Sequence, residues 1–81
     1  MASVRNRVEA VFREVLEDEE LVLSDDMTAD TVKNWDSLNH INIVVMLEAE
    51  FGLQFQAEEI AKLPNVGAFF KLLASYGITD D

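Results

Sequence analysis

The chain has 81 residues, of which 16 are acidic and 6 are basic, so its formal net charge at pH 7 is -10. Its hydrophobic content of 49% is enough for one modest core but not for a deep enclosed catalytic cleft, and we predict a single domain over residues 1–81 that is not an enzyme. A surface this acidic repels nucleic acid and anionic membranes. It favours partner proteins that carry basic patches.

The sequence contains no cysteine, so it has no disulfide and no thiol nucleophile of its own. Its first residues lead directly into an amphipathic pattern and lack the apolar stretch of a signal peptide. No apolar run reaches membrane-spanning length. We therefore expect a cytoplasmic protein that does not insert into membranes, and we expect it to act as a monomer.

The first predicted element is a helix over residues 3–17, where apolar residues recur at helical spacing. Ser3 is placed to cap its start, and the acidic run 17–20 would be unfavourable at a helix C-terminus and ends it. Residues 21–35 have no sustained period and contain many turn-forming residues. We predict a long loop there, held to the core by its scattered apolar side chains.

Three further helices are predicted over residues 36–51, 57–62 and 65–76. Gly52 and Gly77 are well placed to end the second and the fourth, and the Pro64-Asn65 pair starts the last one. The acidic end, Asp80-Asp81, is expected to be mobile. The fold class is therefore all-α: a small three- to four-helix bundle with a long loop between the first two helices.

Two apolar stripes run along the predicted 36–51 helix. The stripe suited to the core consists of Ile43, Leu47 and Phe51. The second stripe consists of Leu38, Ile41 and Val45. Because so small a bundle cannot readily bury both, the second stripe is a candidate docking surface. The alternative is that its side chains cover the core through contacts with the loop.

The tripeptide Asp36-Ser37-Leu38 stands at the start of the same helix. A serine in a helix's first turn lies where free backbone N–H groups and the positive end of the helix dipole favour an attached phosphate. On its own the Asp36-Ser37 dipeptide is better explained by Asp36 as an ordinary N-cap and Ser37 as a solvent-facing residue.

The surrounding pattern is more specific. Residues 35–41 read WDSLNHI and residues 43–52 read IVVMLEAEFG. Together with the amphipathic first helix, the long loop, the short third helix and the aromatic last helix, this pattern resembles the acyl carrier protein family over nearly the whole chain.

The resemblance implies that a phosphopantetheinyl transferase attaches 4'-phosphopantetheine from coenzyme A to Ser37, and that the thiol of this arm carries acyl intermediates as thioesters. The chain itself would contribute no catalytic residue. It would present its cargo to acyl-loading and acyl-transferring enzymes of fatty acid, lipid or polyketide-type biosynthesis. By position, the residues expected to contact these partners are Asp36, Leu38, Ile41, Val45 and Glu48.

The chain departs from the family pattern at several positions. Asn39, Asn42 and Ala49 stand where acidic residues are common, which favours a specialised pathway with its own partners. Asn34 stands where many relatives have glycine, a tolerable change because asparagine readily adopts left-handed conformations.

Other interpretations remain open at this stage. A peptidyl or aminoacyl carrier would have the same fold, and a helical adaptor could use the second stripe without any modification. A small hydrolase with Ser37 as nucleophile and His40 as base is disfavoured, because no third group is evident to orient His40, for which an exposed helical position is expected. Trp35 could anchor the loop or contact the arm. No metal site is predicted, because the acidic clusters lack the spacing of a calcium loop.

Overall fold

The computed structural model describes residues 3–79, and this part of the chain is helical without strands. Its helices are α1 (Val4–Leu16), α2 (Ser37–Phe51), α3 (Ala57–Ile60) and α4 (Val66–Ser75). The predicted all-α class is confirmed, and so is the long connection between the first two helices. The predicted third helix is too long by two residues, because the backbone at 61–62 forms a turn instead. Asp80 and Asp81 lie outside the described residues.

The ends of the helices follow from the capping residues that the sequence indicates. Ser3 Oγ accepts the Asn6 N–H at 3.0 Å, and Glu17 ends α1 in a left-handed conformation with φ 54°. Gly52 ends α2 in the same way with φ 67°. Asn65 caps α4 by accepting a backbone N–H with its side chain. These local signals set where the helices begin and end.

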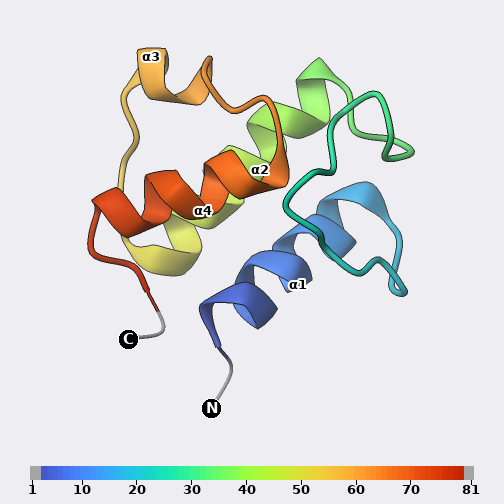
Figure 1. Ribbon diagram of the computed structural model, residues 1–81, viewed down its shortest axis with the longest axis horizontal. Helices are drawn as coiled ribbons and strands as arrows, with labels where there is room; N and C mark the ends of the chain where they lie inside the picture. The colour runs from blue at the N-terminus through green and yellow to red at the C-terminus, as the bar shows by residue number, and fades with distance from the viewer. Residues whose placement is uncertain (1–2, 80–81) are drawn as a thin grey trace.

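The core is built around aromatic side chains from three different segments. Phe12 of α1 meets Trp35 and Phe69 edge to face, with ring centroids 5.4 Å apart in both pairs. From α2, Ile43 and Leu47 are fully buried, as the sequence predicts. Figure 1 shows α4 crossing α2 while α1 lies beside them and α3 stands at one end. All the segments thus share one core.

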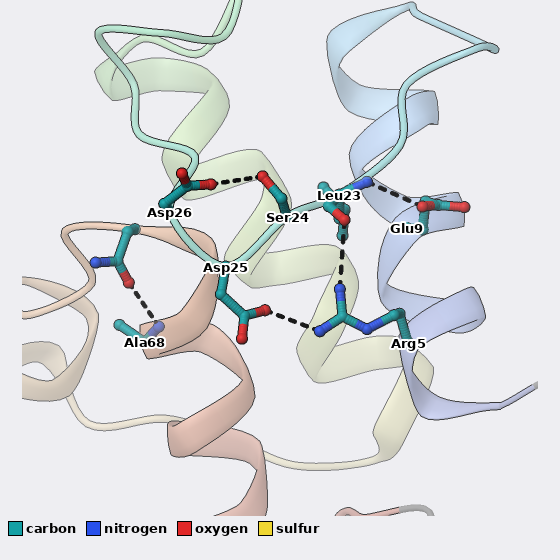
Figure 2. A network of polar contacts seen from close by, with 8 residues as sticks. Arg5, Glu9, Leu23, Ser24, Asp25, Asp26 and Ala68 are labelled. Atoms are coloured by element: carbon teal, nitrogen blue, oxygen red, sulfur yellow. Dashed lines mark hydrogen bonds and ion pairs between the residues drawn. The ribbon is translucent and has the colours of Figure 1, made fainter.

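The loop between α1 and α2 is ordered by polar contacts as well as by apolar ones. Leu23 is buried, its N–H donates to Glu9 Oε2 at 3.0 Å, and its carbonyl accepts from Arg5. Arg5 also pairs with Asp25 at 2.8 Å (Figure 2). Asp25 O in turn accepts the Gly67 N–H of α4 at 2.9 Å, where a Cβ on Gly67 would lie only 3.2 Å from Asp25. The loop therefore bridges α1 and α4.

Candidate functional site

Ser37 is the first residue of α2 and its side chain is exposed. Asp36 precedes it as the N-cap, with Oδ1 accepting the Asn39 N–H at 2.8 Å and the backbone oxygen accepting the His40 N–H at 2.8 Å. The Ser37 hydroxyl makes no hydrogen bond within residues 3–79. The cap thus uses Asp36 and leaves the Ser37 hydroxyl accessible.

The backbone that leads into α2 is fixed from two sides. Asn34 adopts the left-handed conformation that the sequence analysis allowed for it, with φ 71°. The Asn34 side-chain amide donates to Leu16 O at the end of α1, at 3.1 Å. The Asn34 backbone carbonyl accepts from Asn39 Nδ2 of α2, at 2.7 Å. These two hydrogen bonds connect the loop residue Asn34, three positions before Ser37, to both α1 and α2.

Trp35 anchors the loop, which is one of the two roles that the sequence left open for it. Its side chain is 4% exposed and packs against Phe12 and Phe69. The indole Nε1–H donates to His40 Nδ1 at 3.3 Å, and the two rings are nearly parallel. The residue directly before the Asp36-Ser37 pair is therefore part of the core.

His40 is half-buried, so the expectation of an exposed helical histidine is wrong. The ring packs against Trp35 and Phe69, and its Nε2 lies 3.3 Å from Ile60 O at the end of α3. A carbonyl can only accept and Trp35 Nε1–H can only donate, so a neutral ring with the proton on Nε2 satisfies both partners. His40 thereby links α2, α3 and the loop.

This arrangement gives no support to a hydrolase that uses Ser37 and His40. Both ring nitrogens of His40 are engaged by Trp35 and Ile60, and no hydrogen bond joins the ring to Ser37 among residues 3–79. A general base must be within hydrogen-bond reach of the hydroxyl that it activates. His40 is therefore not placed to act as a general base for Ser37.

A groove adjoins Ser37 between the start of α2, the preceding loop and the segment that includes α3. Its lining is mainly apolar and includes Trp35, Ile41, Ile60 and Leu63. The sequence analysis did not predict the α3 side of this groove, because a contact between residues 20 or more positions apart leaves no local signal. A group attached to Ser37 would have this groove directly beside it.

The second stripe is exposed. Leu38 is 69% exposed, while Ile41 and Val45 are each 55% exposed. The alternative in which these side chains cover the core is wrong. Glu48 differs from them, because it is half-buried and its Oε2 accepts the Phe55 N–H at 2.7 Å. Contact of these residues with partner enzymes stays a prediction.

Two general features of residues 3–79 complete the description of the site. Nowhere in this range do three or more histidine, cysteine, aspartate or glutamate side chains gather closely enough to hold a metal ion. None of the helices there has the length and apolar character needed to cross a membrane.

The solved structures that resemble this chain include two acyl carrier protein structures. One is the solution structure of holo acyl carrier protein from Geobacter metallireducens, with 35% sequence identity and a TM-score of 0.76, covering 85% of this chain and 83% of that one. The other is a proposed acyl carrier protein from Mycobacterium tuberculosis, with 17% identity and a TM-score of 0.80, covering 89% of this chain and 96% of that one. The second likeness concerns the fold alone. No family model matches the sequence, and no curated protein is significantly similar to it.

Proposed function

The chain belongs to the acyl carrier protein family, and we propose that it carries acyl groups as thioesters on a 4'-phosphopantetheine arm attached to Ser37. The observation that carries the proposal is the exposed Ser37 hydroxyl at the first position of α2, free of hydrogen bonds to residues 3–79. In this proposal Ser37 is a substrate of a phosphopantetheinyl transferase and the chain performs no catalysis.

The residues around Ser37 fit a phosphodiester. The N–H groups of Ser37 and Leu38 have no partner within residues 3–79, whereas the Asn39 N–H is taken by Asp36. These free donors lie at the positive end of the helix dipole, where a phosphate is favoured. The first turn of α2 would therefore stabilise the phosphate group on Ser37.

When attached, the arm supplies the thiol that this chain lacks, since the sequence has no cysteine. The protein's contribution is to hold the attachment point still. Trp35 is packed into the core before Ser37, and Asn34 ties the same loop to Leu16. A cargo tethered at a fixed point meets successive enzymes at high effective concentration.

The composition of α2 supports a specialised pathway of fatty acid, lipid or polyketide-type synthesis. Asn39, Asn42 and Ala49 occupy positions at which carriers of housekeeping fatty acid synthesis commonly have acids. Enzymes whose binding surfaces match a more acidic helix would bind this less acidic helix more weakly. We therefore propose that dedicated enzymes load and unload the cargo.

The test is the intact mass of the protein after incubation with coenzyme A, magnesium and a broad-specificity phosphopantetheinyl transferase. We expect a gain of one phosphopantetheinyl group in the unaltered chain and none in Ser37→Ala. Ser75→Ala is a matched control, because Ser75 is also an exposed helical serine, and it should be modified fully.

Absence of any gain, with this transferase and with the transferases of the host, would contradict the proposal. The unmodified adaptor would then be the better account. It predicts that partner binding is the same for Ser37→Ala and for the unaltered chain.

A further inference from the structure

The ring of His40 has a hydrogen-bond partner on each of its two nitrogens. The Trp35 indole N–H points at Nδ1 from 3.3 Å, and Ile60 O lies 3.3 Å from Nε2. An indole N–H can only donate and a carbonyl oxygen can only accept, so each partner fixes the role of the nitrogen that it faces. Only the neutral ring, with its proton on Nε2, satisfies both partners.

A second proton on the ring would break this arrangement. It would be carried by Nδ1 and would point at the Trp35 indole N–H, so that two donors would face each other. Turning the ring over does not help, because both nitrogens of the charged ring are donors. Trp35 cannot turn away either, since its side chain is 4% exposed and packs against Phe12 and Phe69. The protonated histidine is therefore the side chain that has to move.

The groove beside Ser37 offers the charged ring a place to move to. Within residues 3–79, the charged side chains that line this groove together with His40 are Asp30 and Asp36 from the loop side and Lys62 from the segment after α3. From α4, the ring contacts only the uncharged Phe69. Two carboxylates attract an imidazolium into the groove and one ammonium opposes this, so the balance of charge favours movement out of the half-buried position.

The helix that accepts the other hydrogen bond is weakly held. Helix α3 is four residues long and none of its side chains is buried. It is attached to α2 by the contact between Ile60 O and His40, and to the end of α4 by the hydrogen bond from the Tyr76 hydroxyl to Glu59. A segment with so few buried contacts opens locally at a small cost in free energy.

We propose that His40 is a pH-sensitive link between α2 and α3. The neutral ring holds Trp35 and Ile60 O, and uptake of a proton releases both and loosens residues 57–62 along the groove. Histidine is the side chain that ordinarily changes its charge between about pH 5 and pH 8, so the link should open within that range as the pH falls. This device goes beyond the proposed carrier function and does not depend on modification of Ser37.

The second attachment of α3 stays intact over the same range. The hydrogen bond from Tyr76, and then that from the Gln56 N–H, lower the pKa of Glu59 below its ordinary value near 4.5. The bond to Glu59 is also the main cause that raises the pKa of Tyr76 above its ordinary value near 10.0. Glu59 therefore stays ionised and Tyr76 stays protonated between about pH 5.5 and pH 8. A change in α3 within this range points to His40.

The first test is an NMR titration of the full chain between about pH 8 and pH 5.5. The sequence has one tryptophan and one histidine, so the indole N–H and imidazole signals need no further assignment. We expect the indole N–H resonance of Trp35 to move upfield and to exchange faster with water, with the same midpoint as the ring protons of His40.

The second test measures amide protection factors at both ends of this titration. The N–H groups of residues 59–62 donate within the α3 segment, to the carbonyls of residues 56, 57 and 59. We expect their protection to fall about threefold to tenfold on acidification, the effect of losing one hydrogen bond. Protection of Leu47, which is fully buried in α2, should stay unchanged.

His40→Gln is the matched control. Its amide oxygen can accept from the Trp35 indole and its amide nitrogen can donate to Ile60 O, but it does not titrate. We expect this variant to keep the protection of residues 59–62 at both pH values. Near-ultraviolet circular dichroism at about pH 8 checks that it is folded.

Two outcomes would overturn the proposal. One is an indole N–H resonance and a protection of residues 59–62 that stay constant while the His40 ring titrates. The other is a loss of protection in His40→Gln equal to that in the unaltered chain, because another group would then be responsible. If His40→Gln does not fold, the titration of the unaltered chain still decides, since its indole and imidazole signals report on the two sides of the link directly.

Discussion

Helices α1 and α2 pack against each other but differ in what they present to solvent. On α1, each of the three arginines forms an ion pair with a carboxylate. The pairs are Arg5 with Asp25, Arg7 with Glu50, and Arg13 with Glu9. On α2, the exposed face holds Leu38, Ile41 and Val45.

The contrast separates a face that supports the fold from a face that adds little to it. Exposed ion pairs contribute little energy each, but Arg5 pairs with Asp25 of the loop and Arg7 with Glu50 of α2, so these two pairs help to fix the loop and α2 against α1. The second stripe contacts solvent and adds nothing comparable to the core. An apolar surface that does not stabilise the fold is characteristic of a docking site.

The largest effect is expected when an aspartate is introduced on the buried face of α2 and, in a separate variant, on its exposed face. Val44 is 2% exposed and its neighbour Val45 is 55% exposed. We expect Val44→Asp to lower the free energy of unfolding by about 4 kcal/mol, because it buries a carboxylate without a partner. Val45→Asp should lower it by less than about 0.5 kcal/mol.

Urea unfolding followed by circular dichroism measures both variants under the same conditions. If Val45→Asp is destabilised as strongly as Val44→Asp, the second stripe contributes to the core and the two faces of α2 are not distinct.

The sequence predicts the parts of this picture that depend on neighbouring residues. The caps Ser3 and Asp36 and the stop at Gly52 are local signals, and helical periodicity separates Ile43 from Ile41 as buried and exposed residues. The family pattern points to Ser37, and the helix start explains its exposure.

The remaining features depend on contacts between distant segments. His40 meets Ile60 O across 20 positions, and Arg7 meets Glu50 across 43. No spacing rule connects such pairs, so the sequence could predict neither the half-buried histidine nor the pairing of the α2 carboxylates. For the same reason, the sequence could not predict that the segment around α3 forms one side of the groove beside Ser37.

A second prediction concerns His40, which links α2 to α3 through Ile60 O, whereas the ion pairs of Arg5 and Arg7 link α1 to the loop and to α2. His40→Ala leaves Trp35 Nε1–H and Ile60 O without their partner. Because the site is half-buried and both contacts are 3.3 Å long, we expect a loss of about 1–2 kcal/mol in the free energy of unfolding. Hydrogen exchange should become faster over residues 57–62.

Asn42→Ala is the control on the same helix, because it removes one exposed side-chain hydrogen bond, and it should change stability by less than about 0.5 kcal/mol. If the exchange of residues 57–62 is the same in both variants, His40 does not hold α3 in place.

The smallest expected effect tests a second link between α3 and the core, the hydrogen bond from the Tyr76 hydroxyl to Glu59 Oε1. This bond, and then the Gln56 N–H, lower the pKa of Glu59 below its ordinary value near 4.5. The same bond is the main reason that the pKa of Tyr76 is raised above its ordinary value near 10.0. Tyr76→Phe removes it and should destabilise the protein slightly at neutral pH.

The pH dependence identifies the cause of that loss. A lowered carboxyl pKa stabilises the fold above about pH 4.5, and this contribution disappears as the pH falls through the folded-state pKa. A raised tyrosine pKa stabilises the fold below about pH 10.0, and this contribution disappears as the pH rises through the folded-state value. The stability difference between the unaltered chain and Tyr76→Phe should therefore be largest near neutrality and narrow in acid and in alkali. A difference that stays constant in urea unfolding at acidic, neutral and alkaline pH would show that the hydroxyl contributes through packing and not through Glu59.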